Sequence, residues 1–292
     1  MKTSFHRTLK TVGVSTVLAL LTACGGSSSV VDPLTVSSSR VIGLGDGYND
    51  AGFGGVTTRF TVRDATNSVG STVVEQLAPM LGGGNTAVAV TTRRALPASG
   101  VFSYAKGNSL VDSGANNLLT QVDNLITDVG GTFGPSDLIV IHAGMADLRT
   151  SATADDISGA IQTAVQTLIG RQAKFVMILV PIKLDRTPGG GDLAKSTQLF
   201  SNLLAVGSYF GTRSVLVVDL TGPYDAPATS ITFTNKTDAA CSNAALLTGC
   251  AVASADPSYS TWFFSDNYHL TPAGYLWVAQ QAYNGVVRAS WR

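Results

Sequence analysis

The histidine with the clearest chemical context lies near the C-terminus, in the stretch Asp266-Asn267-Tyr268-His269-Leu270-Thr271-Pro272. An aspartate three residues before a histidine in a loop can accept a hydrogen bond from Nδ1–H, which fixes the tautomer and leaves Nε2 outward as a base. Thr271 can cap the free N–H groups of a following helix, and Pro272 suits its first position. The stretch therefore predicts an Asp266–His269 acid–base pair just ahead of a helix.

A second chemically suggestive stretch is Val41-Ile42-Gly43-Leu44-Gly45-Asp46-Gly47-Tyr48, an apolar run that leads into a glycine-rich turn. Such a turn could hold the pyrophosphate of a dinucleotide at a helix N-terminus. The dinucleotide-binding motif needs a third glycine where Tyr48 stands, and the carboxylate of Asp46 would repel a pyrophosphate. We therefore expect no cofactor and no bound metal.

Alternating strands and helices are predicted along most of the chain. Short apolar or β-branched runs at residues 41–44, 101–105, 138–142, 175–182 and 215–220 predict strands. Helical spacing of apolar residues occurs at 69–81, 116–129, 154–168, 193–210 and 272–288. This order predicts an α/β fold with a parallel sheet covered on both faces. Ligands of such sheets bind beyond the carboxyl ends of the strands, which are followed here by residues 45–50, 106–109 and 143–147.

Four stretches at these positions resemble, in order, the sequence blocks of the SGNH or GDSL hydrolases, a family of serine esterases, lipases and acetyl-sugar deacylases. Residues 45–52 resemble the opening block, 102–107 the second and 141–148 the third, while Asp266 and His269 match the final Asp-X-X-His block. The resemblance implies a three-layer flavodoxin-like fold over residues 40–292, with a central parallel sheet of about five strands. It also implies carboxyl-ester hydrolysis as the family reaction.

The resemblance assigns roles to five positions, two of which carry the wrong side chain. The family's catalytic positions fall on Gly47, Asp266 and His269, and its oxyanion hole on Gly47, Gly107 and Ala146. Gly47 stands where the family has its nucleophilic serine, and Ala146 where it has an oxyanion-binding asparagine. Losing the serine of such a triad costs about 10⁶-fold in turnover, and losing one oxyanion donor costs about 10²–10³-fold. A conventional acyl-enzyme route is therefore excluded.

Three functions remain compatible with these departures. The chain is expected to be a catalytically degenerate protein that binds acyl lipids or acetylated glycans, a weak hydrolase in which His269 activates water, or a scaffold whose family site is unused. Tyr48, Ser103 and Ser109 could act as substitute nucleophiles, but loop contact, strand packing and turn formation explain them more simply. His142 lies within an apolar strand pattern and is expected to be a packed core residue. Substitutions introduced by engineering would also account for Gly47 and Ala146.

The first 23 residues have the composition of a secretory signal peptide. They carry three basic residues and no acidic one, followed by an apolar run too short to span a bilayer with its flanking loops. Leu21-Thr22-Ala23-Cys24 resembles the lipobox of bacterial lipoproteins, in which the cysteine is lipidated. By resemblance to lipoprotein sorting in Gram-negative bacteria, glycine rather than aspartate at position 25 implies the outer membrane. Residues 24–39 are expected to form a flexible tether.

Charge and cysteine content agree with an exported protein that does not bind nucleic acid. The 292-residue chain has 19 basic and 19 acidic residues, so removal of the three basic residues before position 23 would leave a net charge of −3. Neither value provides a field that attracts a phosphate backbone. With Cys24 lipidated, Cys241 and Cys250 remain as a pair expected to form a disulfide in an oxidising compartment. The sequence predicts no specific protein partner.

Overall fold

The computed structural model describes residues 38–55, 59–63, 71–226, 231–242 and 250–291. All of them belong to one unit of the chain, Leu34–Arg292. The predicted signal peptide, Cys24 and nearly all of the predicted tether lie outside the described residues. Within the described part, no helix combines the length and the apolar character that a membrane crossing needs.

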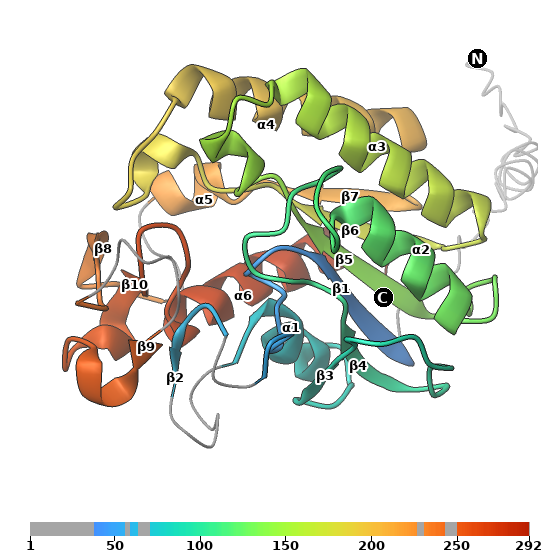
Figure 1. Ribbon diagram of the computed structural model, residues 1–292, viewed down its shortest axis with the longest axis horizontal. Helices are drawn as coiled ribbons and strands as arrows, with labels where there is room; N and C mark the ends of the chain where they lie inside the picture. Colours follow the sequence, from blue (N-terminus) through green and yellow to red (C-terminus); the bar gives the residue numbers. More distant parts are fainter. Residues whose placement is uncertain (1–37, 56–58, 64–70, 227–230, 243–249, 292) are drawn as a thin grey trace, which may run out of the picture. The chain divides into compact units, whose positions relative to one another are not determined.

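A parallel sheet of six strands forms the centre of the fold, with the order β3-β4-β1-β5-β6-β7 (Figure 1). The strands are β1 (Arg40–Gly45), β3 (Ala87–Ala89), β4 (Gly100–Ser103), β5 (Asp137–His142), β6 (Phe175–Leu179) and β7 (Val215–Val218). The five predicted strands are present, and the predicted α/β class with a parallel sheet is confirmed. The sequence did not predict β3, which contains only three residues at the sheet edge.

Helices cover both faces of this sheet, as expected for a parallel sheet. The helices are α1 (Val73–Met80), α2 (Leu118–Asp128), α3 (Ala154–Gly170), α4 (Leu193–Phe210), α5 (Thr221–Asp225) and α6 (Pro272–Arg288). One core lies between the sheet and α1 and α6, whereas a second lies between the sheet and α2, α3 and α4 (Figure 1). Alternate strand residues divide between them: Val140 faces the first core, and its neighbours Ile139 and Ile141 face the second.

Small elements lie beside the sheet and precede α6. They are β2 (Val62–Arg63) paired with β9 (Cys250–Ala251), and β8 (Asn235–Ala239) paired with β10 (Trp262–Phe264). A disulfide joins Cys241 to Cys250. It links the segment after β8 to the start of β9, so it stabilises the small strands rather than the main sheet.

Two local features fix the loops that matter for the site. Gly45 ends β1 with φ of 104°, and a Cβ there would lie 1.8 Å from the backbone oxygen of His142, so only glycine fits. The side-chain amide of Gln121 accepts from the Gly45 N–H at 2.7 Å and donates to its carbonyl at 2.9 Å. At the other end of the chain, Thr271 caps α6 by accepting from the Gly274 N–H at 3.1 Å, as predicted.

Candidate active site

Asp266 and His269 form a hydrogen-bonded pair in the turn between β10 and α6. Nδ1 of His269 lies 3.0 and 3.1 Å from the two carboxylate oxygens of Asp266. The backbone N–H groups of Tyr268 and His269 also donate to Asp266, at 2.8 and 2.7 Å. The turn is closed by a hydrogen bond from the Ser265 N–H to the His269 carbonyl. The carboxylate therefore holds the ring with Nδ1 inward and Nε2 away from it.

Burial and hydrogen bonding act in opposite directions on Asp266, which is fully buried. Burial alone would raise the pKa of this carboxyl. The charge of the His269 ring and the hydrogen bonds from that ring and from the two backbone N–H groups outweigh burial, so the pKa of Asp266 is lowered. The Asp266 carboxyl group is therefore ionised at neutral pH. It orients the imidazole by accepting a hydrogen bond from Nδ1–H.

Gly47 lies directly against the other side of this imidazole. A Cβ built on Gly47 would be 2.4 Å from both Nε2 and Cδ2 of His269. Real Cβ atoms do not approach other atoms this closely, so the imidazole occupies the space that a side chain at position 47 would need. Position 47 has no nucleophilic side chain, and the imidazole of His269 lies where that side chain would be.

Phe60 packs against the His269 ring beside Gly47. No pattern in the sequence predicts Phe60 at this place. Its ring lies 4.5 Å from the His269 ring, centroid to centroid, and it is 8% exposed. A Cβ on Gly107 would be 1.6 Å from the edge of the Phe60 ring, so Phe60 is in direct contact with the Gly107 backbone. The hydroxyl of Tyr275 donates to the Phe60 carbonyl at 2.8 Å and lies 3.4 Å from the Gly47 carbonyl. Phe60 therefore fills the space between His269 and Gly107.

The Gly107 N–H, expected to face an oxyanion, donates instead to Asp50 at 2.7 Å. The second oxygen of Asp50 accepts from the N–H groups of Gly52 and Phe53. Burial raises the pKa of Asp50, although these hydrogen bonds and Arg59 oppose the rise. The Gly107 donor is therefore already used by the carboxyl group of Asp50.

Ala146 lies in the loop after β5 and is buried, with no side-chain donor. The next residue, Asp147, accepts from the Val111 N–H at 3.1 Å. Burial, together with the nearby charge of Asp46, raises the pKa of Asp147 to about 6. The side chain at position 146 therefore supplies no hydrogen bond to an oxyanion, and the next side chain is a buried carboxyl group.

His142 is fully buried, as the sequence predicted for a packed core residue, but it is also paired with a carboxylate. Its Nδ1 lies 2.5 Å from Oδ1 of Asp46, and its ring stacks on Tyr48 with centroids 3.7 Å apart. Gly45 and His142 are register partners on β1 and β5, which brings Asp46 beside the histidine. The chain register, rather than a local motif, creates this second pair.

The three hydroxyls considered as substitute nucleophiles are all engaged with backbone carbonyls. Tyr48 is buried with its hydroxyl 3.4 Å from the Tyr268 carbonyl, and Ser103 donates to Asn49 at 2.5 Å. Ser109 donates to the Asn116 carbonyl. These contacts agree with structural roles. In the part of the chain that the structure describes, no group of three His, Cys, Asp or Glu residues could hold a metal ion.

A family model described as GDSL-like lipase/acylhydrolase matches residues 41–282. None of the curated proteins compared with this sequence matches it. Similar solved structures include a protein described as a GDSL-like lipase from Parabacteroides merdae, with a TM-score of 0.50 and 12% identity over 87% of this chain and 97% of the other. A lipase/acylhydrolase from Enterococcus faecalis has a TM-score of 0.49 and 12% identity, covering 85% and 94%. A variant of an acetyl-xylooligosaccharide esterase from Geobacillus has a TM-score of 0.48 and 14% identity, over 85% of this chain and 94% of the other.

Proposed function

Because the chain belongs to the GDSL-like lipase/acylhydrolase family, whose reaction is ester hydrolysis, we propose that it is a catalytically degenerate member that binds an ester-bearing ligand without hydrolysing it. The ligand is an acyl lipid or an acetylated glycan. The protein is held at the outer membrane by a lipid on Cys24, facing the periplasm or the exterior. Export and anchoring rest on the composition of residues 1–23 and the sequence around Cys24.

The position of Gly47 opposite His269 carries this proposal. The family mechanism needs an oxygen nucleophile hydrogen-bonded to the imidazole, and the space for its side chain is taken by the imidazole itself. Loss of a serine in this role costs about 10⁶-fold in turnover. The remaining rate would depend on the oxyanion hole and on binding alone.

The surroundings of the oxyanion position support the same proposal. Ala146 supplies no donor, the Gly107 N–H is bound to Asp50, and Phe60 covers both Gly107 and His269. One lost oxyanion donor costs about 10²–10³-fold. Drift that removed only the nucleophile would leave the hole intact. Here the hole is also closed, which is consistent with a site that no longer stabilises a transition state.

A second candidate function is slow ester hydrolysis by water that His269 activates. The specific observation in its favour is the Asp266–His269 pair, which keeps the hydrogen bonds and the ionised carboxylate of a working acid–base pair. A general base alone contributes about 10²–10⁴-fold. By this route the rate depends on His269 and is far below that of a serine esterase.

Two measurements on the purified protein test the proposal. Release of p-nitrophenol from its acetate, butyrate and decanoate esters is compared between the wild type and His269→Ala, and we expect equal rates. Thermal unfolding is then recorded with acetylated xylotriose and with octanoyl glycerol, and we expect at least one of them to raise the midpoint. A His269-dependent rate would favour the water mechanism, and stabilisation by neither ligand would contradict a binding role.

A further inference from the structure

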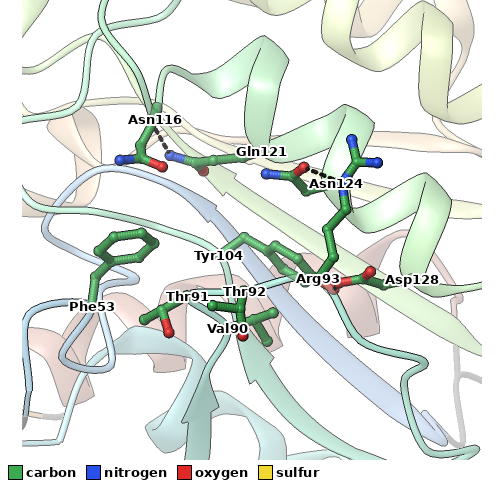
Figure 2. Close-up of a pocket in the computed structure, with 10 residues that line it drawn as sticks. All are labelled: Phe53, Val90, Thr91, Thr92, Arg93, Tyr104, Asn116, Gln121, Asn124 and Asp128. Carbon is green, nitrogen blue, oxygen red and sulfur yellow. Dashed lines mark hydrogen bonds between the residues drawn. The ribbon is translucent and has the colours of Figure 1, made fainter.

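A pocket of about 160 Å³ lies apart from Gly47 and His269, and the family's catalytic residues do not line it (Figure 2). Its walls come from the loop after β1, the segments that follow β3 and β4, and helix α2 with the residue Asn116 before it. By volume it accommodates about five water molecules, which is comparable with one ring of a small polar ligand. Nothing in the family assignment explains it.

Two aromatic rings form part of the wall. Figure 2 shows Phe53 on one side of the pocket and Tyr104 on another. The hydroxyl of Tyr104 donates to Asp128 at 2.7 Å, which fixes the position of its ring. Phe53 is partly exposed, and the ammonium group of Lys106 lies 5.6 Å from its centroid. Tyr104 is almost fully buried, so Phe53 is the ring that offers contact to the apolar C–H face of a ligand.

Polar side chains form the rest of the lining, and several keep hydrogen-bonding capacity. The Arg93 Nε–H donates to the side-chain oxygen of Asn124 at 3.1 Å, which leaves the amide NH₂ of Asn124 on the pocket (Figure 2). Among the described residues, the side-chain amide of Asn116 has no hydrogen-bond partner. The amide of Asn116 therefore offers both an acceptor and a donor, and that of Asn124 offers its NH₂ donor. Together they suit a ligand with many hydroxyl groups.

These observations distinguish among ligand classes. An acyl chain would cover the side-chain amides of Asn116 and Asn124 without giving them partners, and unpaired polar groups are costly to bury. The lining holds one cation, Arg93, and one carboxylate, Asp128, so it offers no net positive charge that would select an anion. A sugar ring has an apolar face for Phe53 and hydroxyls for the amides. We propose that this pocket binds one ring of a neutral glycan.

A second hollow adjoins the pocket at Asn116. This hollow has a volume of about 310 Å³ and is lined by residues from Lys106 to Asn117, including Gly107. Gln121, which lines the first pocket, is hydrogen-bonded to the backbone of Gly45, two residues before Gly47. A longer glycan anchored in the pocket would meet the second hollow at Asn116. The inference rests on the binding role proposed above and names a glycan as its ligand.

The test is isothermal titration of the purified protein with xylotriose, cellotriose and chitotriose, none of which carries an ester. We expect at least one to bind with a Kd of about 1 mM or tighter, and the corresponding monosaccharide to bind more weakly. Phe53→Ala combined with Asn116→Ala should weaken binding by about tenfold or more, because each truncation removes one contact with the ligand. The matched control is Tyr209→Ala with Asn202→Ala, an aromatic and an amide that line a different hollow between α3 and α4.

The control pair should leave binding within about twofold of the wild type. Absence of binding by all three trisaccharides, or equal losses in the two double variants, would overturn the assignment of the pocket. Stabilisation by octanoyl glycerol without any trisaccharide binding would overturn it as well, while leaving the proposed binding role in place. Trisaccharide binding at the pocket without stabilisation by either ester ligand would support the pocket and contradict the proposed role in ester binding.

Discussion

The imidazole of His269 lies so close to Gly47 that a Cβ at position 47 would be 2.4 Å from Nε2. His269 therefore still faces position 47, where the family has its nucleophile. With the imidazole in its present place, position 47 has room only for glycine. The protein thus keeps the arrangement of the family's site and is expected to lack the family's hydrolytic activity. Restoring the serine alone is insufficient, because the imidazole must first move.

Restoring activity should require the removal of Phe60 as well as the return of the missing side chains. Gly47→Ser with Ala146→Asn is expected to give little ester turnover, because Phe60 still covers His269 and Gly107. Adding Phe60→Ala gives the imidazole room to retreat from Ser Oγ. We expect this triple variant to exceed the double variant by about tenfold or more with p-nitrophenyl acetate.

The matched control carries Gly47→Ala in place of Gly47→Ser in the triple variant. It has the same Cβ and the same vacated Phe60 position but no nucleophile, so its rate should equal that of the wild type. Equal rates for the serine and alanine triple variants, with both proteins folded, would show that Phe60 is not the remaining obstacle.

The contact between Phe60 and Gly107 predicts a strong energetic coupling. Gly107→Ala should lower the free energy of unfolding by about 1–3 kcal/mol, because its methyl group would overlap the phenyl ring. In the Phe60→Ala background the same methyl has room, so its cost should nearly vanish. Urea unfolding of the four proteins measures the coupling. Additive effects would mean that the ring does not lie on Gly107.

Asp147 predicts a pH dependence of stability. Its pKa is raised to about 6 in the folded protein, mainly by burial. The protonated form is favoured on folding, so its contribution to stability is complete below the unfolded pKa near 4 and is lost as the pH rises through about 6. Asp147→Asn keeps an acceptor for the Val111 N–H and carries no charge.

We therefore expect Asp147→Asn to match the wild type at pH 4 and to be more stable at pH 7, by at most about 3 kcal/mol. Chemical unfolding at the two pH values measures the difference. The control is Asp123→Asn, an exposed aspartate on α2, whose stability should follow the wild type at both. A constant difference between Asp147→Asn and the wild type across this range would contradict the assignment.

The sheet could be predicted because its strands are continuous apolar runs, which only burial on both faces explains. β3 escaped prediction because three residues of alanine and valine give no recognisable period. The Asp266–His269 pair was predictable for a different reason: its members are three residues apart, so their contact depends only on a local turn. The same holds for the Thr271 cap of α6.

The closure of the site could not be predicted in this way. Phe60 is one apolar residue among many in the sequence, and its contact with His269 joins segments about two hundred residues apart. The engagement of Gly107 by Asp50 depends on how two loops meet, and the Asp46–His142 pair depends on the register of β1 against β5. None of these contacts leaves a periodic or local pattern.

The measurement that tests the central claim most directly is the fate of a bound ester. The purified protein is dialysed to equilibrium against acetylated xylotriose, and the excess ligand retained on the protein side is quantified and weighed by mass spectrometry. We predict that the ligand is retained with its acetyl groups intact and that no acetate is released beyond the level seen with His269→Ala. Release of acetate by the wild type but not by His269→Ala, or failure to retain the ligand at all, would contradict the account.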